Sequence, residues 1–178
     1  MLDQSIFREY DIRGIADTQM PSEGIRLLGH ALGSYLYRKG ARTVNVGRDA
    51  RLSGPRLRGA LVEGLPSSGM NVVDLGMVPP PVLDYSVYKF GAQGGVMITG
   101  SHNPSDYNGF KTMFGSGTIH GAEIQEIYRM IVDRDFEMGA GTLSEADAVT
   151  PYVEELAGSF DFPRRVKAVF DNGNGAAG

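Results

Sequence analysis

The chain has 178 residues, a length typical of one domain, or of one domain and the beginning of another. Seventeen Lys and Arg residues against 21 Asp and Glu residues give a formal net charge of −4, which argues against a nucleic-acid-binding protein. Cysteine is absent, so disulfides, thiolate metal sites and cysteine nucleophiles are excluded. Because the sequence has neither a long apolar run nor a signal peptide, we expect a cytoplasmic protein without membrane contact.

Helical and strand patterns alternate from the N-terminal part onward. Apolar residues at helical spacing predict a helix over residues 22–39, and a β-branched run predicts a strand over residues 43–46. A second helix should begin at Ser53, which suits a cap position, and end before Pro66.

The alternation continues through the middle of the chain. Apolar runs predict strands over residues 70–76 and 94–98, with a helix over residues 82–90 between them. After a polar loop, a further strand is expected over residues 109–113 and an amphipathic helix over residues 123–136.

Strand–helix alternation of this kind predicts a three-layer α/β/α sandwich with a mainly parallel, mixed sheet. The small, polar residues near 139–147 predict a domain boundary, which divides the chain into a first domain, residues 1–147, and the beginning of a second, residues 148–178. In that second part we expect a helix over residues 151–160 and a strand over residues 166–172. A final strand without a partner indicates that the chain is the N-terminal portion of something longer.

The richest chemistry lies in TGSHNPSDYNGFK, residues 99–111, directly after an apolar strand. Open α/β sheets bind ligands at the carboxyl ends of their strands, so Ser101 should face a ligand site. The same composition is typical of an ordinary turn, and composition alone leaves that interpretation open. A serine hydrolase is excluded, because its nucleophile elbow needs glycines where Thr99 and Asn103 stand. His102 adjoins Ser101, but neighbours in sequence need not face each other, so the pair does not indicate a dyad.

Five sequence blocks resemble those of the α-D-phosphohexomutase family, in that family's order and spacing. They are FREYDIRG (7–14), GRDARLSG (47–54), DLGMVPPPV (74–82), the serine loop (99–111) and DNGNGAAG (171–178). Phosphoglucosamine mutases typically have a different N-terminal block and an alanine before the serine, where this chain has Gly100. The resemblance is therefore closer to the bacterial phosphomannomutase/phosphoglucomutase group, with phosphoglucosamine mutase as an alternative.

The resemblance implies a reversible shift of a phosphoryl group between positions 1 and 6 of a hexose, through a phosphoserine enzyme, a hexose 1,6-bisphosphate and Mg²⁺. By position, Ser101 would be the phosphoserine and, through its phosphate, one metal ligand. The remaining ligands would come from a DxDxD cluster, which this sequence does not contain. Lys111 would offset charge or move a proton, and His102 would be a second catalytic group.

The resemblance also implies four residues that bind the phosphosugar or its phosphate, namely Tyr10, Arg13, Asn103 and Arg48. The Arg13 guanidinium could fork onto phosphate oxygens, whereas without the resemblance an ion pair with Asp11 or Glu9 on the surface is the expected role. Asp49 is interpreted as an orienting partner rather than a catalyst.

A dinucleotide fingerprint is also present, because Gly173, Gly175 and Gly178 have G-x-G-x-x-G spacing. The resemblance assigns these glycines to the first turn of a second domain, and an NAD site is therefore rejected. Two functions of different classes stay open. The chain is either the N-terminal part of a mutase, inactive without its domains 2–4, or a non-catalytic module that binds a phosphosugar or a protein. Its residues do not distinguish mannose from glucose.

Overall fold

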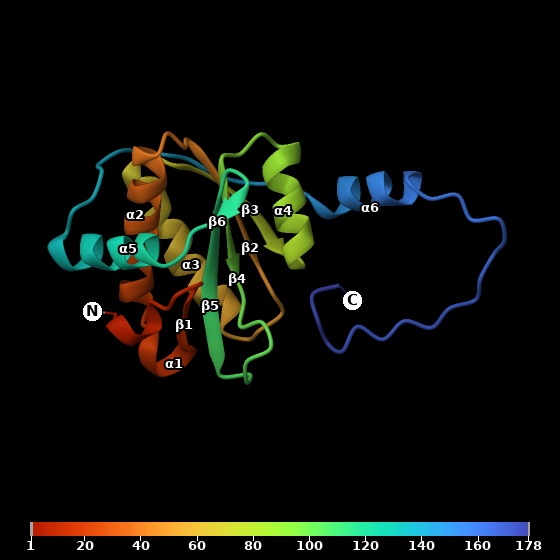
Figure 1. Cartoon of the computed structure of the whole chain (residues 1–178), viewed down its shortest axis with the longest axis horizontal. Helices are drawn as coiled ribbons and strands as arrows, with labels where there is room; N and C mark the ends of the chain where they lie inside the picture. The colour runs from red at the N-terminus through yellow and green to blue at the C-terminus, as the bar shows by residue number, and fades with distance from the viewer. Residues whose placement is uncertain (1, 178) are drawn as a thin grey trace.

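The structure, a computed structural model, describes residues 2–177 and contains a seven-stranded mixed sheet between helical layers (Figure 1). The strands lie in the order β1-β5-β4-β2-β3-β7, with β6 paired to β5. Their bounds are Ile12–Ile15 (β1), Thr43–Arg48 (β2), Asn71–Met77 (β3), Gly94–Ile98 (β4), Tyr107–Phe114 (β5), Gly117–Thr118 (β6) and Leu143–Glu145 (β7). The expected α/β/α sandwich with a mixed sheet is confirmed.

Strand direction divides the sheet into two parts. β4, β2, β3 and β7 run parallel to one another, whereas β5 runs antiparallel to both β4 and β1. The chain therefore turns directly from β4 into β5, with Ile98 opposite Phe110. The polar loop between these two strands contains Ser101, and it projects from the carboxyl end of β4.

Three helices cover one face of the sheet, namely α2 (Ser22–Arg38), α3 (Gly54–Gly64) and α5 (Ala122–Asp133). Their apolar stripes meet the sheet in the larger core, in which Leu28, Leu61 and Val96 are fully buried. The short helices η1 (Gln4–Ile6) and α1 (Ala16–Gln19) flank β1. The helices predicted from periodicity are thus present, with ends that differ by a few residues.

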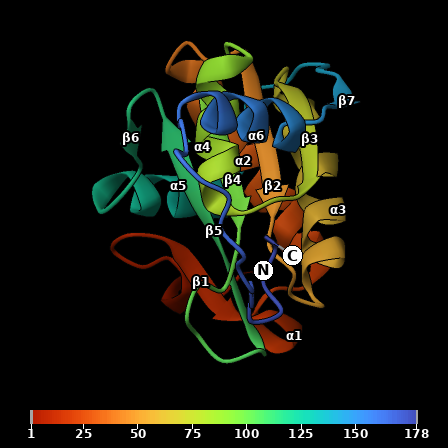
Figure 2. The same ribbon diagram turned by 90° about the vertical axis from the view of Figure 1, so that its right-hand side faces the viewer.

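The opposite face carries α4 (Pro80–Lys89), on which α6 (Val149–Gly158) lies (Figure 2). A smaller core beneath α4 contains Leu83 and Met97. The Tyr85 hydroxyl donates a hydrogen bond of 3.0 Å to Glu155, and the rings of Tyr85 and Tyr152 lie 5.3 Å apart. The helix that the sequence assigns to a second domain therefore contacts the first.

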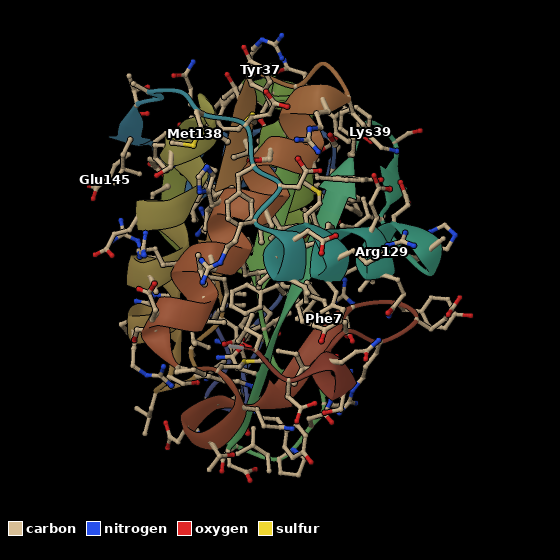
Figure 3. The ribbon with its side chains drawn as sticks, turned by 90° about the vertical axis from the view of Figure 1, so that its left-hand side faces the viewer. Phe7, Tyr37, Lys39, Arg129, Met138 and Glu145 are labelled. Carbon is tan, nitrogen blue, oxygen red and sulfur yellow. The ribbon has the colours of Figure 1, made fainter. Side chains whose placement is uncertain are left out.

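The segment between α5 and β7 crosses α2 and carries Met138, and β7, which ends at Glu145, lies at the edge of the molecule (Figure 3). It is hydrogen-bonded to η2 (Leu65–Ser68), since the Gly139 and Gly141 amides each donate to a carbonyl of that turn at 2.9 Å. The small residues that predicted a boundary therefore form an ordered crossing that supplies β7. The boundary at residue 147 itself stays a prediction.

One expected strand is wrong. Residues 166–172 are exposed and form no strand, because an extended segment becomes a strand only when another strand pairs with it. Pro66 ends α3 as expected, and the chain continues there as η2. No helix within residues 2–177 is both long enough and apolar enough to span a membrane.

Candidate active site

The loop after β4 and the loop after β2 lie side by side at the same edge of the sheet, because β2 and β4 are parallel neighbours. The amide of Asp49 donates to the carbonyl of Ile98 at 2.9 Å, and the amide of Thr99 donates to Gly109 at 3.0 Å. Two backbone hydrogen bonds thus define the base of the serine loop. Ser101 lies at the carboxyl end of a buried strand, as expected from the sequence.

Ser101 has an unfavourable backbone conformation. Its φ angle is +52°, a left-handed conformation that costs a non-glycine residue about 1–2 kcal/mol. Its amide donates to the Thr99 hydroxyl at 2.9 Å, whereas its own hydroxyl forms no hydrogen bond with any residue from 2 to 177. The side chain is exposed, so this hydroxyl is open to an incoming group.

Asp49 connects the two loops. One carboxylate oxygen accepts from the Thr99 hydroxyl at 2.8 Å and from the Gly100 amide at 3.2 Å. The other accepts from the Arg51 amide at 3.0 Å. Both oxygens are therefore occupied by groups of the loops, and the contacts of Asp49 are those of an orienting residue.

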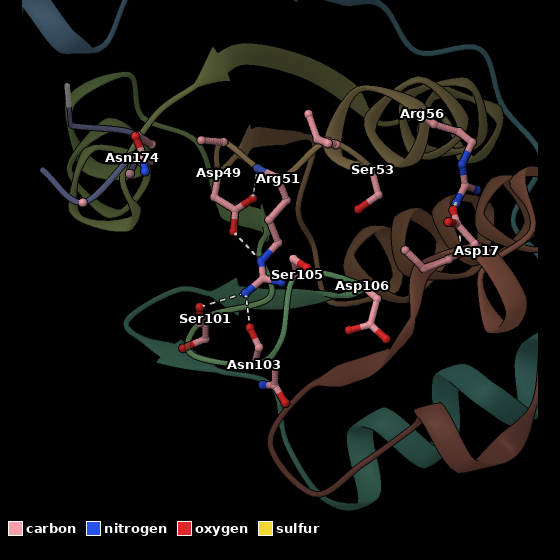
Figure 4. A pocket seen from close by; sticks show the side chains of 16 residues that line it. Asp17, Asp49, Arg51, Ser53, Arg56, Ser101, Asn103, Ser105, Asp106 and Asn174 are labelled. Atoms are coloured by element: carbon pink, nitrogen blue, oxygen red, sulfur yellow. Dashed lines mark hydrogen bonds and ion pairs between the residues drawn. The ribbon is translucent and has the colours of Figure 1, made fainter.

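Arg51 extends beneath the serine loop and donates to several of its backbone carbonyls (Figure 4). The sequence alone predicts no role for this residue in the site. The available signal was its place in GRDARLSG, three residues after β2, but nothing in that block shows that its partners are carbonyls.

Arg13 is buried, with 8% of its surface exposed. Its Nε donates to Asp11 at 2.8 Å, and its Nη1 donates to the carbonyl of Gly100. The ion pair with Asp11 that was considered as an alternative is therefore present, but beneath the serine loop rather than at the surface. The guanidinium is engaged on both sides, so in this structure it holds the loop.

The other expected residues differ in their contacts and in their exposure. The Asn103 amide donates to the Gly100 carbonyl at 3.2 Å, and Arg48 donates to the carbonyl of Asp49 at 3.1 Å. His102 is exposed, and Tyr10 is exposed over 74% of its surface.

Lys111 lines a different hollow from the one that Ser101 lines. It lies on β5 opposite Met97 and lines a separate hollow of about 290 Å³ together with Asp84 and Thr118.

A hollow of about 900 Å³ opens beside the serine loop and is lined by both loops, by α1 and by the C-terminal segment (Figure 4). Ser101 and Asn103 contribute one wall, Asp17 and Arg56 another, and the third comes from residues 173–176. The expected fingerprint glycines Gly173 and Gly175 lie here without a following helix among the described residues, and Gly178 lies outside the described residues.

The residues around Ser101 do not form a metal site by themselves. No group of three His, Asp or Glu side chains within residues 2–177 is arranged to hold a metal ion. Asp49, which contacts the serine loop from the loop after β2, already accepts hydrogen bonds at both oxygens. Mg²⁺ prefers six oxygen ligands, so this part of the chain does not fit a complete Mg²⁺ site.

Comparison with known proteins identifies similar sequences along nearly the whole chain. Residues 4–138 match the family model described as "Phosphoglucomutase/phosphomannomutase, alpha/beta/alpha domain I". A phosphomannomutase/phosphoglucomutase of Pseudomonas putida is 40% identical over 177 residues, and a phosphoglucomutase of Neisseria meningitidis serogroup B is 39% identical over 177 residues. The alignments cover 99% and 98% of this chain but 38% of each relative.

A solved structure agrees with these sequence matches. A phosphoglucomutase/phosphomannomutase family protein from Burkholderia thailandensis superimposes with a TM-score of 0.87 and 42% identity, over 92% of this chain and 38% of that one. The chain thus spans somewhat more than a third of the length of the relatives that it matches.

Proposed function

Since the chain belongs to the phosphoglucomutase/phosphomannomutase family, we propose that it carries the phosphoserine of a phosphohexomutase, Ser101. The reaction is the reversible conversion of a hexose 6-phosphate to a hexose 1-phosphate. The observation that carries the proposal is the exposed Ser101 hydroxyl, which has no partner within residues 2–177 and lies on a loop held by Asp49, Arg51 and Arg13.

A fixed, unshielded hydroxyl is suited to phosphoryl transfer because such transfer depends on positioning and on charge stabilisation more than on covalent chemistry. In the forward half-reaction the P–O bond to Ser101 breaks while a bond forms from phosphorus to the oxygen of the free sugar hydroxyl. That hydroxyl loses its proton, and the departing Ser101 oxygen takes one up. The product is a hexose 1,6-bisphosphate. In the return half-reaction the other phosphoryl group moves to the Ser101 oxygen and leaves the isomeric monophosphate.

The residues of this chain have different proposed roles. Asn103, in the serine loop, and His102, the residue after Ser101, are proposed as contacts of the phosphoryl group. Tyr10 and Arg48 are proposed as contacts of the sugar phosphate. Lys111 is proposed as the group that offsets charge or moves the proton, although it lines a different hollow from Ser101.

Mg²⁺ and the hexose 1,6-bisphosphate remain part of the proposal, with the Ser101 phosphate as one metal ligand. Bound Mg²⁺ would withdraw charge from a phosphoryl oxygen. Because residues 2–177 offer no cluster for it, the other ligands would have to come from further domains of the protein, as would the groups that read the sugar. We propose mannose and glucose phosphates, rather than glucosamine phosphate, as the substrates. The reason is that the similar proteins are a phosphomannomutase/phosphoglucomutase and a phosphoglucomutase. A cytoplasmic location stays a prediction.

The absence of a metal cluster in residues 2–177 favours one second candidate, a non-catalytic module that binds a phosphosugar. The two candidates differ at Ser101, since only a mutase transfers phosphorus to it. The test is peptide-resolved mass spectrometry of residues 99–111 in the full-length protein, after incubation with glucose 1,6-bisphosphate and Mg²⁺.

We expect one added phosphoryl group on Ser101, its loss when a hexose monophosphate is added, and interconversion of the two monophosphates. Ser101→Ala should abolish both the modification and the interconversion. Ser105→Ala, in the same loop, is the matched control and should keep both. An unmodified Ser101 in a protein that binds the bisphosphate would refute the mutase and support the binding module.

A further inference from the structure

The inference concerns Arg51, and it rests on the proposed function because its subject is how Ser101 is held. We propose that Arg51 is the positioning residue of the serine loop, and that a side chain at residue 100 would displace its guanidinium.

The contacts of Arg51 are concentrated on one segment. Its Nη2 donates to the carbonyls of Ser101 at 3.1 Å and Asn103 at 2.6 Å. Its Nη1 donates to the carbonyl of Tyr107 at 2.8 Å and to that of Pro104. One guanidinium thus binds four carbonyls, three in the turn after β4 and the fourth at Tyr107, the first residue of β5.

The third side of the guanidinium faces Asp49. The Arg51 Nε lies 3.5 Å from a carboxylate oxygen of Asp49, and that same oxygen accepts from Thr99 and Gly100. The two side chains are only 15% and 18% exposed. Arg51 therefore connects the carboxylate at the base of the loop with the carbonyls at its tip, and solvent competes weakly for these contacts.

Only arginine has the geometry for this arrangement. Its guanidinium is planar and presents five N–H donors in directions that are fixed relative to one another. A lysine ammonium has the same charge but three donors at a single point, so it cannot reach carbonyls on both sides of the turn. Replacing arginine by lysine therefore keeps the charge and removes most of the cross-links.

Gly100 provides the second, independent observation. A Cβ placed on this residue would lie 2.2 Å from both Cζ and Nε of Arg51. The guanidinium cannot move aside without losing its carbonyl partners, so this contact is not relieved by a flexible side chain. A side chain at residue 100 would therefore compete with the Arg51 guanidinium for the same space.

Arg51 acts on the reaction through the loop. Its contacts are with the carbonyl of Ser101 and not with the Ser101 hydroxyl, so it is not placed to take or give the proton. The left-handed φ of Ser101 is a strained conformation that surrounding contacts must hold. Loss of the cross-links should therefore let the loop relax and move the hydroxyl away from its reactive position.

The test compares Arg51→Lys with Arg42→Lys in the full-length protein. Arg42 is a matched control because it also donates to backbone carbonyls, those of Tyr37 and Ala41, but at the opposite end of β2. Peptide-resolved hydrogen exchange measures the opening of residues 99–107, and steady-state kinetics with a hexose phosphate and Mg²⁺ separate kcat from KM.

For Arg51→Lys we expect at least tenfold faster exchange in residues 99–107, unchanged exchange in α2 and α5, a kcat lowered at least tenfold and a KM within threefold of wild type. Arg42→Lys should leave both the loop exchange and kcat at wild-type values. A general loss of stability would accelerate exchange throughout, and that result would overturn a local positioning role.

Loop exchange and kcat within twofold of wild type in Arg51→Lys would also overturn the proposal. If this variant does not fold, Gly100→Ala replaces it, because the added methyl group displaces the same guanidinium while Arg51 remains. Wild-type exchange of residues 99–107 in Gly100→Ala would then refute the inference. Failure of the proposed function is recognised separately, since a wild-type protein without phosphoryl transfer still reports on the cross-links by hydrogen exchange.

Discussion

The packing of α3 against α2 depends on a glycine, and its substitution gives a sharp test of that packing. Gly64 at the end of α3 faces the backbone of α2. A Cβ on Gly64 would lie 2.0 Å from the carbonyl oxygen of Arg26 and 2.9 Å from the amide nitrogen of His30. Both are backbone atoms, so neither can be displaced by a rotamer change.

The magnitude follows from this distance. Ordinary contact begins at 3.4 Å, so α2 and α3 would have to separate by about 1.4 Å to admit the methyl group. A gap of about 0.5–1 Å already removes a quarter to a half of the dispersion energy of the contacts that line it. Overpacking of a core costs about 1–3 kcal/mol or more, against about 1 kcal/mol gained from replacing a helical glycine with alanine. Because the methyl group would meet backbone atoms, we expect the upper end of this overpacking range, about 3 kcal/mol, and less the helical gain Gly64→Ala should destabilise the protein by about 2 kcal/mol.

Gly59 is the matched control in the same helix. A Cβ on this residue would meet no atom within 4 Å, so Gly59→Ala receives the helical gain without the clash and should stabilise the protein by about 0.5–1 kcal/mol. Urea unfolding followed by circular dichroism measures both variants, with unchanged m-values as the condition for comparing midpoints. A Gly64→Ala protein within 0.5 kcal/mol of wild type would refute the described packing of α2 on α3.

Two further predictions concern an acid-sensitive cluster and the strained serine. The Tyr35 hydroxyl and Lys39, 2.9 Å away, donate to Glu123 and hold the pKa of that carboxyl below its ordinary value of 4.5. The contribution of ionised Glu123 to the free energy of unfolding is therefore complete above pH 4.5 and is lost as the pH falls through the folded-state pKa. In urea titrations, Glu123→Gln should destabilise the protein at pH 6 and have progressively less effect below pH 4.5. At Ser101, where φ is +52°, glycine should be more stable than alanine by about 0.5–1 kcal/mol, and equal midpoints for Ser101→Gly and Ser101→Ala would argue against the left-handed conformation.

Much of the site follows from local sequence. An apolar run followed by a polar loop places Ser101 at the end of a strand, and the parallel strand before GRDARLSG places Asp49 at the same edge. Arg51 was not recognised because its partners are backbone carbonyls, which every residue has and which no motif records. The position of Lys111 relative to Ser101 depends on the register of β5 against β4, which its own sequence does not specify.

The periodicity of apolar residues determined the helices α2 to α5 and the central strands, because a 3.6-residue or two-residue repeat is a local property of the chain. The tertiary structure decided which segments pair. It turned the small, polar stretch after α5 into a crossing that ends in β7, and it left residues 166–172 without a partner and therefore without a strand. It also brought α6 onto α4. Pairing and docking depend on hydrogen-bond partners and apolar surfaces that come from distant parts of the chain, and for that reason the sequence pattern of one segment cannot determine them.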